Sequence, residues 1–154
     1  MNLAHIHLLL NHIPIIAVPI GLLFLLRTLW TSNIGERKFA YLFLFLTSLS
    51  VIAVYLTGEP AEEVIEHLPG ITEAIIEPHE EAGLVALVLT LIMGATSFVA
   101  LFFKQDGTQS RIAKNFVIAT AVIATGTLSY TAYLGGQIRH TEIRENSSSG
   151  PTNE

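Results

Sequence analysis

The chain has 154 residues, of which 51% are hydrophobic and only 14% are charged, whereas a soluble domain carries about 25% charged residues. It contains no cysteine, which excludes disulfides, thiolate metal sites and iron–sulfur clusters. The net charge of -5 argues against a nucleic-acid partner. These features predict a single membrane-embedded domain.

Four apolar runs are each about as long as the roughly 20 residues that a helix needs to cross a bilayer. They lie at Leu8–Leu29, Phe39–Leu56, Ala82–Phe103 and Phe116–Leu134. Because lipid cannot satisfy backbone hydrogen bonds, and because the runs are too long for barrel strands, we predict an all-α integral membrane four-helix bundle. The first run lacks a basic leader and a small-residue cleavage site, so we interpret it as a retained helix. Residues 1–145 would form this domain, and the polar residues 146–154 a disordered tail.

The basic residues predict the orientation of the bundle in the membrane. Six of the eight Lys and Arg residues lie in the first and third connections, at Arg27, Arg37, Lys38, Lys104, Arg111 and Lys114. By the positive-inside rule these connections are cytoplasmic, so both termini and the 57–81 connection face outward. We therefore expect a multi-pass protein of the inner (cytoplasmic) membrane. All histidines of the chain then fall on the outer side, which favours a shared site: His5, His7, His12, His67, His79 and His140.

Helix one is predicted to begin near Leu8, and three of these histidines stand at its start, in a segment that carries no charge until Arg27. Imidazole is the side chain best suited to bind a transition metal or a haem iron. His7 and His12 are five residues apart, so they differ by about 140° around a helix and cannot both face one metal. They suit two sites, or one ligand and one helper.

The acidic 57–81 connection is the second informative stretch. We expect a short helix that begins near Pro60 and stops at Leu68-Pro69-Gly70, and a second one from Ile71 to Glu77. Both would lie on the membrane surface as a lid over the bundle.

Most of the eight glutamates in this connection are interpreted as a solvated face. Glu59, which lies where helix two leaves the membrane, and Glu63, four residues before His67, are the better candidates for metal ligands, with Glu62 beside them.

The later helices bring two more histidines to the same side. Pro78-His79 is predicted to start helix three. At the outer end of helix four, Gly135-Gly136 either ends the helix or lets the backbone approach a large flat ligand. His140 follows at membrane-surface depth and is flanked by Arg139 and Arg144.

The opening His7-Leu-Leu-Leu-Asn-His12-Ile-Pro14 resembles the H-P-x-x-V-H-F-P opening of the DUF2231 family of small four-helix membrane proteins. Thr57-Gly58, His79, and Leu134-Gly135-Gly136 followed by His140 resemble its later landmarks, in the same order. Leu8 stands where the family often has proline, and the acidic lid is longer than usual. The resemblance implies electron transfer rather than transport, because some members are joined to redox modules. It singles out His7, His12, His79 and His140.

We therefore favour a b-type haem protein with one or two outer haems. His12 and His79 are the first expected pair of axial ligands, and His7 and His140 the second. Arg139 or Arg144 would bind the haem propionates. Because bis-histidine ligation leaves the iron no open position, the task would be electron transfer to or from a quinone or a periplasmic cytochrome.

Two alternatives stay open. The histidines with Glu59, Glu62 or Glu63 would suit copper, zinc, iron or a di-metal pair. The chain would otherwise be a structural subunit of a larger membrane complex, and its partners would then be other subunits or further copies of itself in a homo-oligomer. The sequence shows no charged residue in the middle of a helix, where a transport pathway would place one, and no nucleophile paired with a base.

Overall fold

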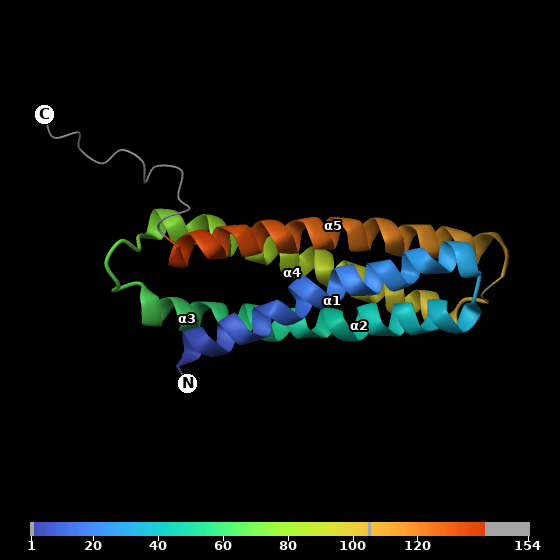
Figure 1. Ribbon diagram of the computed structural model, residues 1–154, viewed down its shortest axis with the longest axis horizontal. Helices are drawn as coiled ribbons and strands as arrows, with labels where there is room; N and C mark the ends of the chain where they lie inside the picture. Colours follow the sequence, from blue (N-terminus) through green and yellow to red (C-terminus); the bar gives the residue numbers. More distant parts are fainter. Residues whose placement is uncertain (1, 105, 141–154) are drawn as a thin grey trace, which may run out of the picture.

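The computed structural model describes residues 2–104 and 106–140, and this part of the chain is all-α, without strands. The helices are α1 (Leu3–Thr31), α2 (Ile34–Leu56), α3 (Gly58–Ile65), α4 (Glu73–Phe102) and α5 (Gly107–Arg139) (Figure 1). The four long helices are each long and apolar enough to cross a membrane. The predicted all-α bundle of four long apolar helices is therefore confirmed. The tail at residues 146–154 and Arg144 lie outside the described residues.

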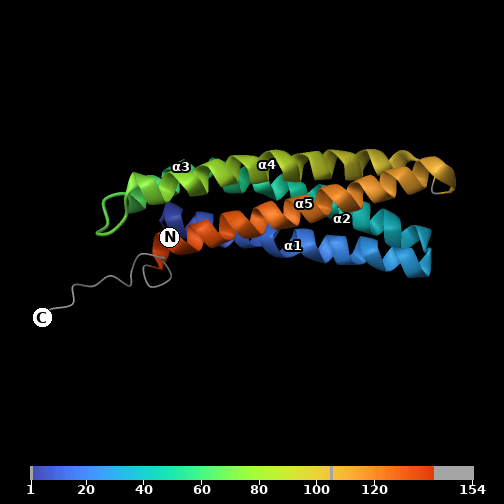
Figure 2. The ribbon, with the colours of Figure 1, turned by 90° about the horizontal axis from the view of Figure 1, so that it is seen from above.

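The four long helices alternate in direction and form a square. α1 and α4 each pack against α2 and α5, so α1 and α4 occupy opposite corners. The N-terminus, α3 and the end of α5 lie at one end of the bundle, and the α1–α2 and α4–α5 connections lie at the other (Figures 1 and 2). The six basic residues of the two short connections therefore belong to one end, and the histidines to the opposite end. We call the histidine end the outer end, after the orientation that the basic residues predict.

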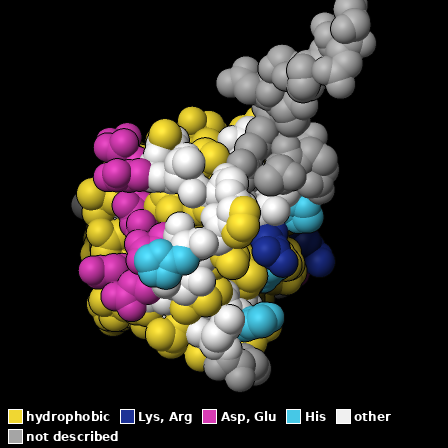
Figure 3. Space-filling model, turned by 90° about the vertical axis from the view of Figure 1, so that its left-hand side faces the viewer, with side chains coloured by type: hydrophobic (Ala, Val, Ile, Leu, Met, Phe, Trp, Pro, Cys, Tyr) yellow, Lys and Arg dark blue, Asp and Glu magenta, His cyan; other side chains and the backbone are white. Residues whose placement is uncertain are grey.

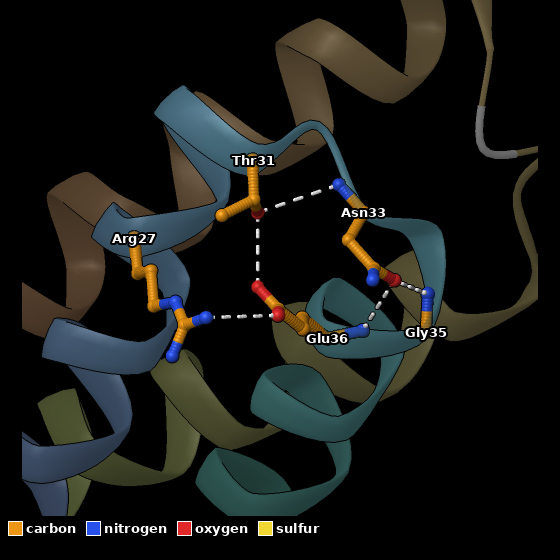
Figure 4. A network of polar contacts seen from close by, with 5 residues as sticks. All are labelled: Arg27, Thr31, Asn33, Gly35 and Glu36. Atoms are coloured by element: carbon orange, nitrogen blue, oxygen red, sulfur yellow. Dashed lines mark hydrogen bonds and ion pairs between the residues drawn. The ribbon is translucent and has the colours of Figure 1, made fainter.

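A small polar network closes the α1–α2 turn (Figure 4). The Asn33 side chain caps α2 by accepting from the backbone N–H groups of Gly35 (2.8 Å) and Glu36 (3.2 Å). The Glu36 carboxylate accepts from the Thr31 hydroxyl (2.9 Å) and pairs with Arg27 (3.3 Å). This network links the end of one helix to the first turn of the next and sets the antiparallel pair.

Two helix starts differ from the sequence-based prediction. α1 begins at Leu3 rather than near Leu8, because the side chain of Asn2 caps it by accepting from the N–H of His5 at 3.0 Å. α4 begins at Glu73, so Pro78 lies inside the helix and does not start it. Proline removes only one backbone donor, and this helix accommodates it in its second turn.

The predicted pair of surface helices is also wrong in part. The segment expected as the second short helix forms the first turns of α4. The first exists as α3, but it follows α2 with only Thr57 between them, and Thr57 keeps a helical backbone conformation (φ −96°, ψ −2°). The chain therefore does not turn across the bundle there. α3 packs against α1 and extends one wall of the bundle.

The core shows that the α1–α2 and α4–α5 hairpins are equivalent. Every buried residue of α1 has a buried counterpart in α4 72 positions later: Pro14 and Ala86, Val18 and Thr90, Gly21 and Met93, Leu25 and Ser97, Thr28 and Ala100. Four buried residues of α2 correspond in the same way to α5, 77 positions later: Ala40 and Val117, Leu44 and Ala121, Thr47 and Ala124, Val51 and Leu128. The bundle thus has a pseudo-two-fold axis along its length that exchanges α1 with α4 and α2 with α5.

The outside of the bundle is apolar. Large hydrophobic side chains such as Leu9, Leu23 and Phe116 are more than half exposed along the helices. So broad an apolar surface is rare on a soluble monomer, and it fits a bilayer environment. The fold therefore indicates a multi-pass membrane protein.

Candidate functional site

A cavity of about 750 Å³ opens at the outer end of the bundle. This volume lies within the range of small-molecule and cofactor sites. Figure 3 looks onto this end. α1, α3, α4 and α5 supply most of its walls, and all four histidines singled out from the sequence line it: His7, His12, His79 and His140.

His7 is half-buried and is held by the end of α2. Its ring Nδ1 lies 3.1 Å from the carbonyl oxygen of Val54 and 3.1 Å from the hydroxyl of Thr57. A carbonyl can only accept, so Nδ1 carries the proton and donates it. The other ring nitrogen, Nε2, is then unprotonated in the neutral ring and can bind a metal.

His79 is held in the same way by α5. Its Nδ1 donates to the carbonyl oxygen of Thr131 at 3.0 Å, and the ring is half-buried. Gly135 makes the space for this ring, because a Cβ at that position would lie 2.9 Å from the ring carbon Cε1. Nε2 of His79 is again the nitrogen available to a ligand.

Each of these histidines, with its carbonyl partner and a nearby glycine, forms one half-site of the cavity. The two half-sites are related by the pseudo-two-fold axis. His7 and His79 are 72 positions apart, as are the buried residues of α1 and α4, and their rings lie close enough to interact electrostatically. Their carbonyl partners, Val54 and Thr131, are 77 positions apart, as are α2 and α5. In each half a glycine follows the carbonyl residue by four positions and faces the histidine ring: a Cβ added at Gly58 would lie 3.9 Å from Cε1 of His7, and one added at Gly135 would lie 2.9 Å from Cε1 of His79.

His12 and His140 line the cavity in a different manner. His12 is exposed, and its Nδ1 bonds to the carbonyl of Leu8 in its own helix. His140 is the C-terminal cap of α5 and is exposed. By pseudo-symmetry these positions correspond to Leu84 and Glu63, so neither has a histidine counterpart. The structure therefore relates His79 to His7, whereas the sequence-based hypothesis paired it with His12.

The three glutamates predicted as metal ligands differ in whether they line the cavity. Glu59 and Glu62 line the cavity, whereas Glu63 is exposed and does not. The side chain of Glu62 interacts with that of Glu80 of α4, which also lines the cavity. No three histidine or carboxylate side chains among residues 2–104 and 106–140 converge as the ligands of one metal ion would.

The remaining candidates lie as follows. Arg139 lines the cavity from the end of α5. His5 is exposed and bonds to Asn2, and exposed His67 pairs with its neighbour Glu66 at 3.3 Å, so both lie away from the cavity wall. α5 continues through Gly135-Gly136 to Arg139, so these glycines do not end the helix.

Sequence reasoning missed the two carbonyl partners. Val54 and Thr131 are apolar or neutral residues that act through their backbone. The signal that could have located them is the pair of glycines, Gly58 and Gly135, near the outer end of each second helix.

Comparisons with protein-family models, with curated proteins and with solved structures return no match. The resemblance to the DUF2231 family therefore stays a hypothesis based on the residues themselves.

Proposed function

We propose that the chain is a b-type haem protein of the cytoplasmic membrane that transfers electrons, in which His7 and His79 would hold one haem through their Nε2 atoms. The observation that carries the proposal is the matched pair of half-sites. Two histidines from opposite corners of the bundle border one cavity, and each has its Nδ1 bonded to a carbonyl of the neighbouring helix. Four-helix bundles build cofactor sites in this way, from side chains on facing helices.

The residues present fit such a group. The carbonyls of Val54 and Thr131 hold each ring in the tautomer whose Nε2 can bind iron, and they raise the basicity of that nitrogen. Gly135 leaves room for the ring of His79. When bound, haem supplies a one-electron couple, and two histidines leave no position for a substrate on the iron.

Haem is favoured over a bound copper, zinc or iron ion by the number of protein ligands. Structural and catalytic sites for such ions use three or four protein ligands, and in the described residues only two histidines are arranged alike. The redox partner would be a quinone, a periplasmic cytochrome or another subunit of a membrane complex, met on the outer side. Both termini would face that side, as the basic residues predict.

The absorption spectrum of the purified protein, oxidised and then reduced, tests this function. We expect reducible bands of a low-spin b-type haem that is not covalently attached, because the chain has no cysteine to form thioether bonds. His7→Ala and His79→Ala should each lose or shift these bands. His12→Ala is the matched control and should keep them, because His12 has no histidine counterpart.

A colourless wild-type preparation from haem-replete cells would contradict the proposal, and elemental analysis of that sample would then test the metal alternative. Bands that survive both His7→Ala and His79→Ala would refute the assigned ligands.

A further inference from the structure

The cavity is symmetric in its histidines but not in its charges. The pseudo-two-fold axis relates Glu62 at the end of α3 to Arg139 at the end of α5, and both residues line the cavity. It also relates Glu80 of α4 to Leu8 of α1, which line it as well. An acidic pair in one half thus corresponds to a cation and an apolar residue in the other.

The acidic edge lies where α3 meets α4. The side chains of Glu62 and Glu80 interact with each other, and the charges of Glu59 and Glu66 also act on Glu62. A carboxylate of a ligand placed here would be repelled, since like charges at close range destabilise each other.

The opposite edge lies where α5 meets α1. Arg139 lines the cavity there, together with the imidazoles of His140 and His12. Figure 3 shows the same division on the outer face, with carboxylates on one side and basic side chains on the other. The guanidinium group is the side chain best suited to bind carboxylates through paired hydrogen bonds.

We propose that this charge difference fixes the orientation of the cavity ligand, with its carboxylates against Arg139 and away from Glu62 and Glu80. The inference rests on the proposed function, since the ligand it orients is haem, whose two propionates are the carboxylates. The matched half-sites alone would accept two orientations related by the pseudo-two-fold axis. Arg139 is a positioning residue and leaves the axial ligands unchanged.

Titration of the full-length apo-protein in detergent with haem b and with haem dimethyl ester tests the inference, because the ester lacks the two carboxylates. The wild type should bind haem b more tightly than the ester. Arg139→Gln should weaken haem b binding about tenfold or more, the factor expected for losing a charge-assisted hydrogen bond. Its affinity for the ester should not change, and the band positions of bound haem should stay those of the wild type.

Two glutamate variants serve as controls, because each removes one negative charge. Glu62→Gln should strengthen haem b binding by removing repulsion. Glu63→Gln, outside the cavity wall, should leave it unchanged.

The outcomes separate the two proposals. If the wild type binds neither compound, the proposed function fails and the inference falls with it. If the wild type binds haem b but Arg139→Gln weakens haem and ester equally, or weakens neither, only the inference is overturned.

Discussion

At the scale of single residues, the site depends on groups that orient the two histidines. Each imidazole is tied to a backbone carbonyl of a neighbouring helix, and such a partner cannot be removed by changing a side chain. The more sensitive positions are those that leave space for the rings. Gly135 is the clearest of these, since a Cβ added there would come within 4 Å of three atoms of the His79 ring.

Gly135→Ala should therefore disturb the site. The added Cβ would lie 2.9 Å from Cε1 of His79, so the ring must move and its bond to Thr131 must weaken. We expect weaker haem binding, and lower thermal stability than for a matched variant. That variant is Gly126→Ala in the same helix, where nothing lies within 4 Å of the new Cβ and alanine gains about 1 kcal/mol of helix propensity.

The two alanine variants can be compared by haem titration and by thermal unfolding in detergent. Equal affinity and equal unfolding temperature for both would contradict the packing role of Gly135.

At the scale of elements, the apolar runs are sufficient to predict the four long helices, because a bilayer leaves the backbone few other choices. The histidines that line the cavity were also predicted from the sequence. The Lys and Arg residues of the two short connections mark one end of the bundle, and this placed all the histidines at the opposite end. The start of α4 and the direction of α3 were not predictable, because Pro78 and Thr57 are each compatible with a break or with a continuous helix. The pairing of His7 with His79 depends on how the two hairpins are aligned with each other. The periodicity of residues within a single helix carries no information about that alignment.

The α1–α2 turn offers a test of how strongly a cap stabilises this hairpin. Asn33→Ala would leave the N–H groups of Gly35 and Glu36 without their acceptor, so the free energy of unfolding should fall by about 1 kcal/mol. Ser32→Gly is the neighbouring control. Ser32 has a left-handed backbone (φ 51°), which glycine adopts without a steric cost, so this variant should be at least as stable as the wild type.

Denaturation in mixed micelles would measure both changes. A loss of stability in Ser32→Gly equal to that in Asn33→Ala would show that the turn, and not the cap, is the sensitive feature.

At the scale of the whole molecule, the bundle has an apolar outer surface and two chemically different ends. One end carries the basic residues of the two short connections, and the other carries the described histidines, most of the carboxylates and the cavity. Any ligand or partner of the cavity is therefore met on one side of the membrane only.

Single-cysteine labelling tests which side that is, because the chain has no cysteine of its own. Leu68→Cys, beyond α3, should react with a membrane-impermeant maleimide added to intact cells. Thr108→Cys, in the first turn of α5, should react only after the cells are opened. The reverse pattern would place the cavity in the cytoplasm and would remove a periplasmic cytochrome from the set of partners.

The two hairpins differ in length in one informative respect. The chain between the histidine and its carbonyl partner spans 47 residues in the first hairpin and 52 in the second. The five additional residues lie at the basic end, where α5 begins about one turn earlier in the sequence than the position equivalent to the start of α2, and the half-sites still match. The cavity therefore tolerates a difference in length at the basic end, whereas a one-residue insertion in the helical turns next to His79 or Thr131 would turn one of these residues away from the other. The geometry of the cavity thus constrains the spacing of residues at the histidine end far more than the length of the chain at the basic end.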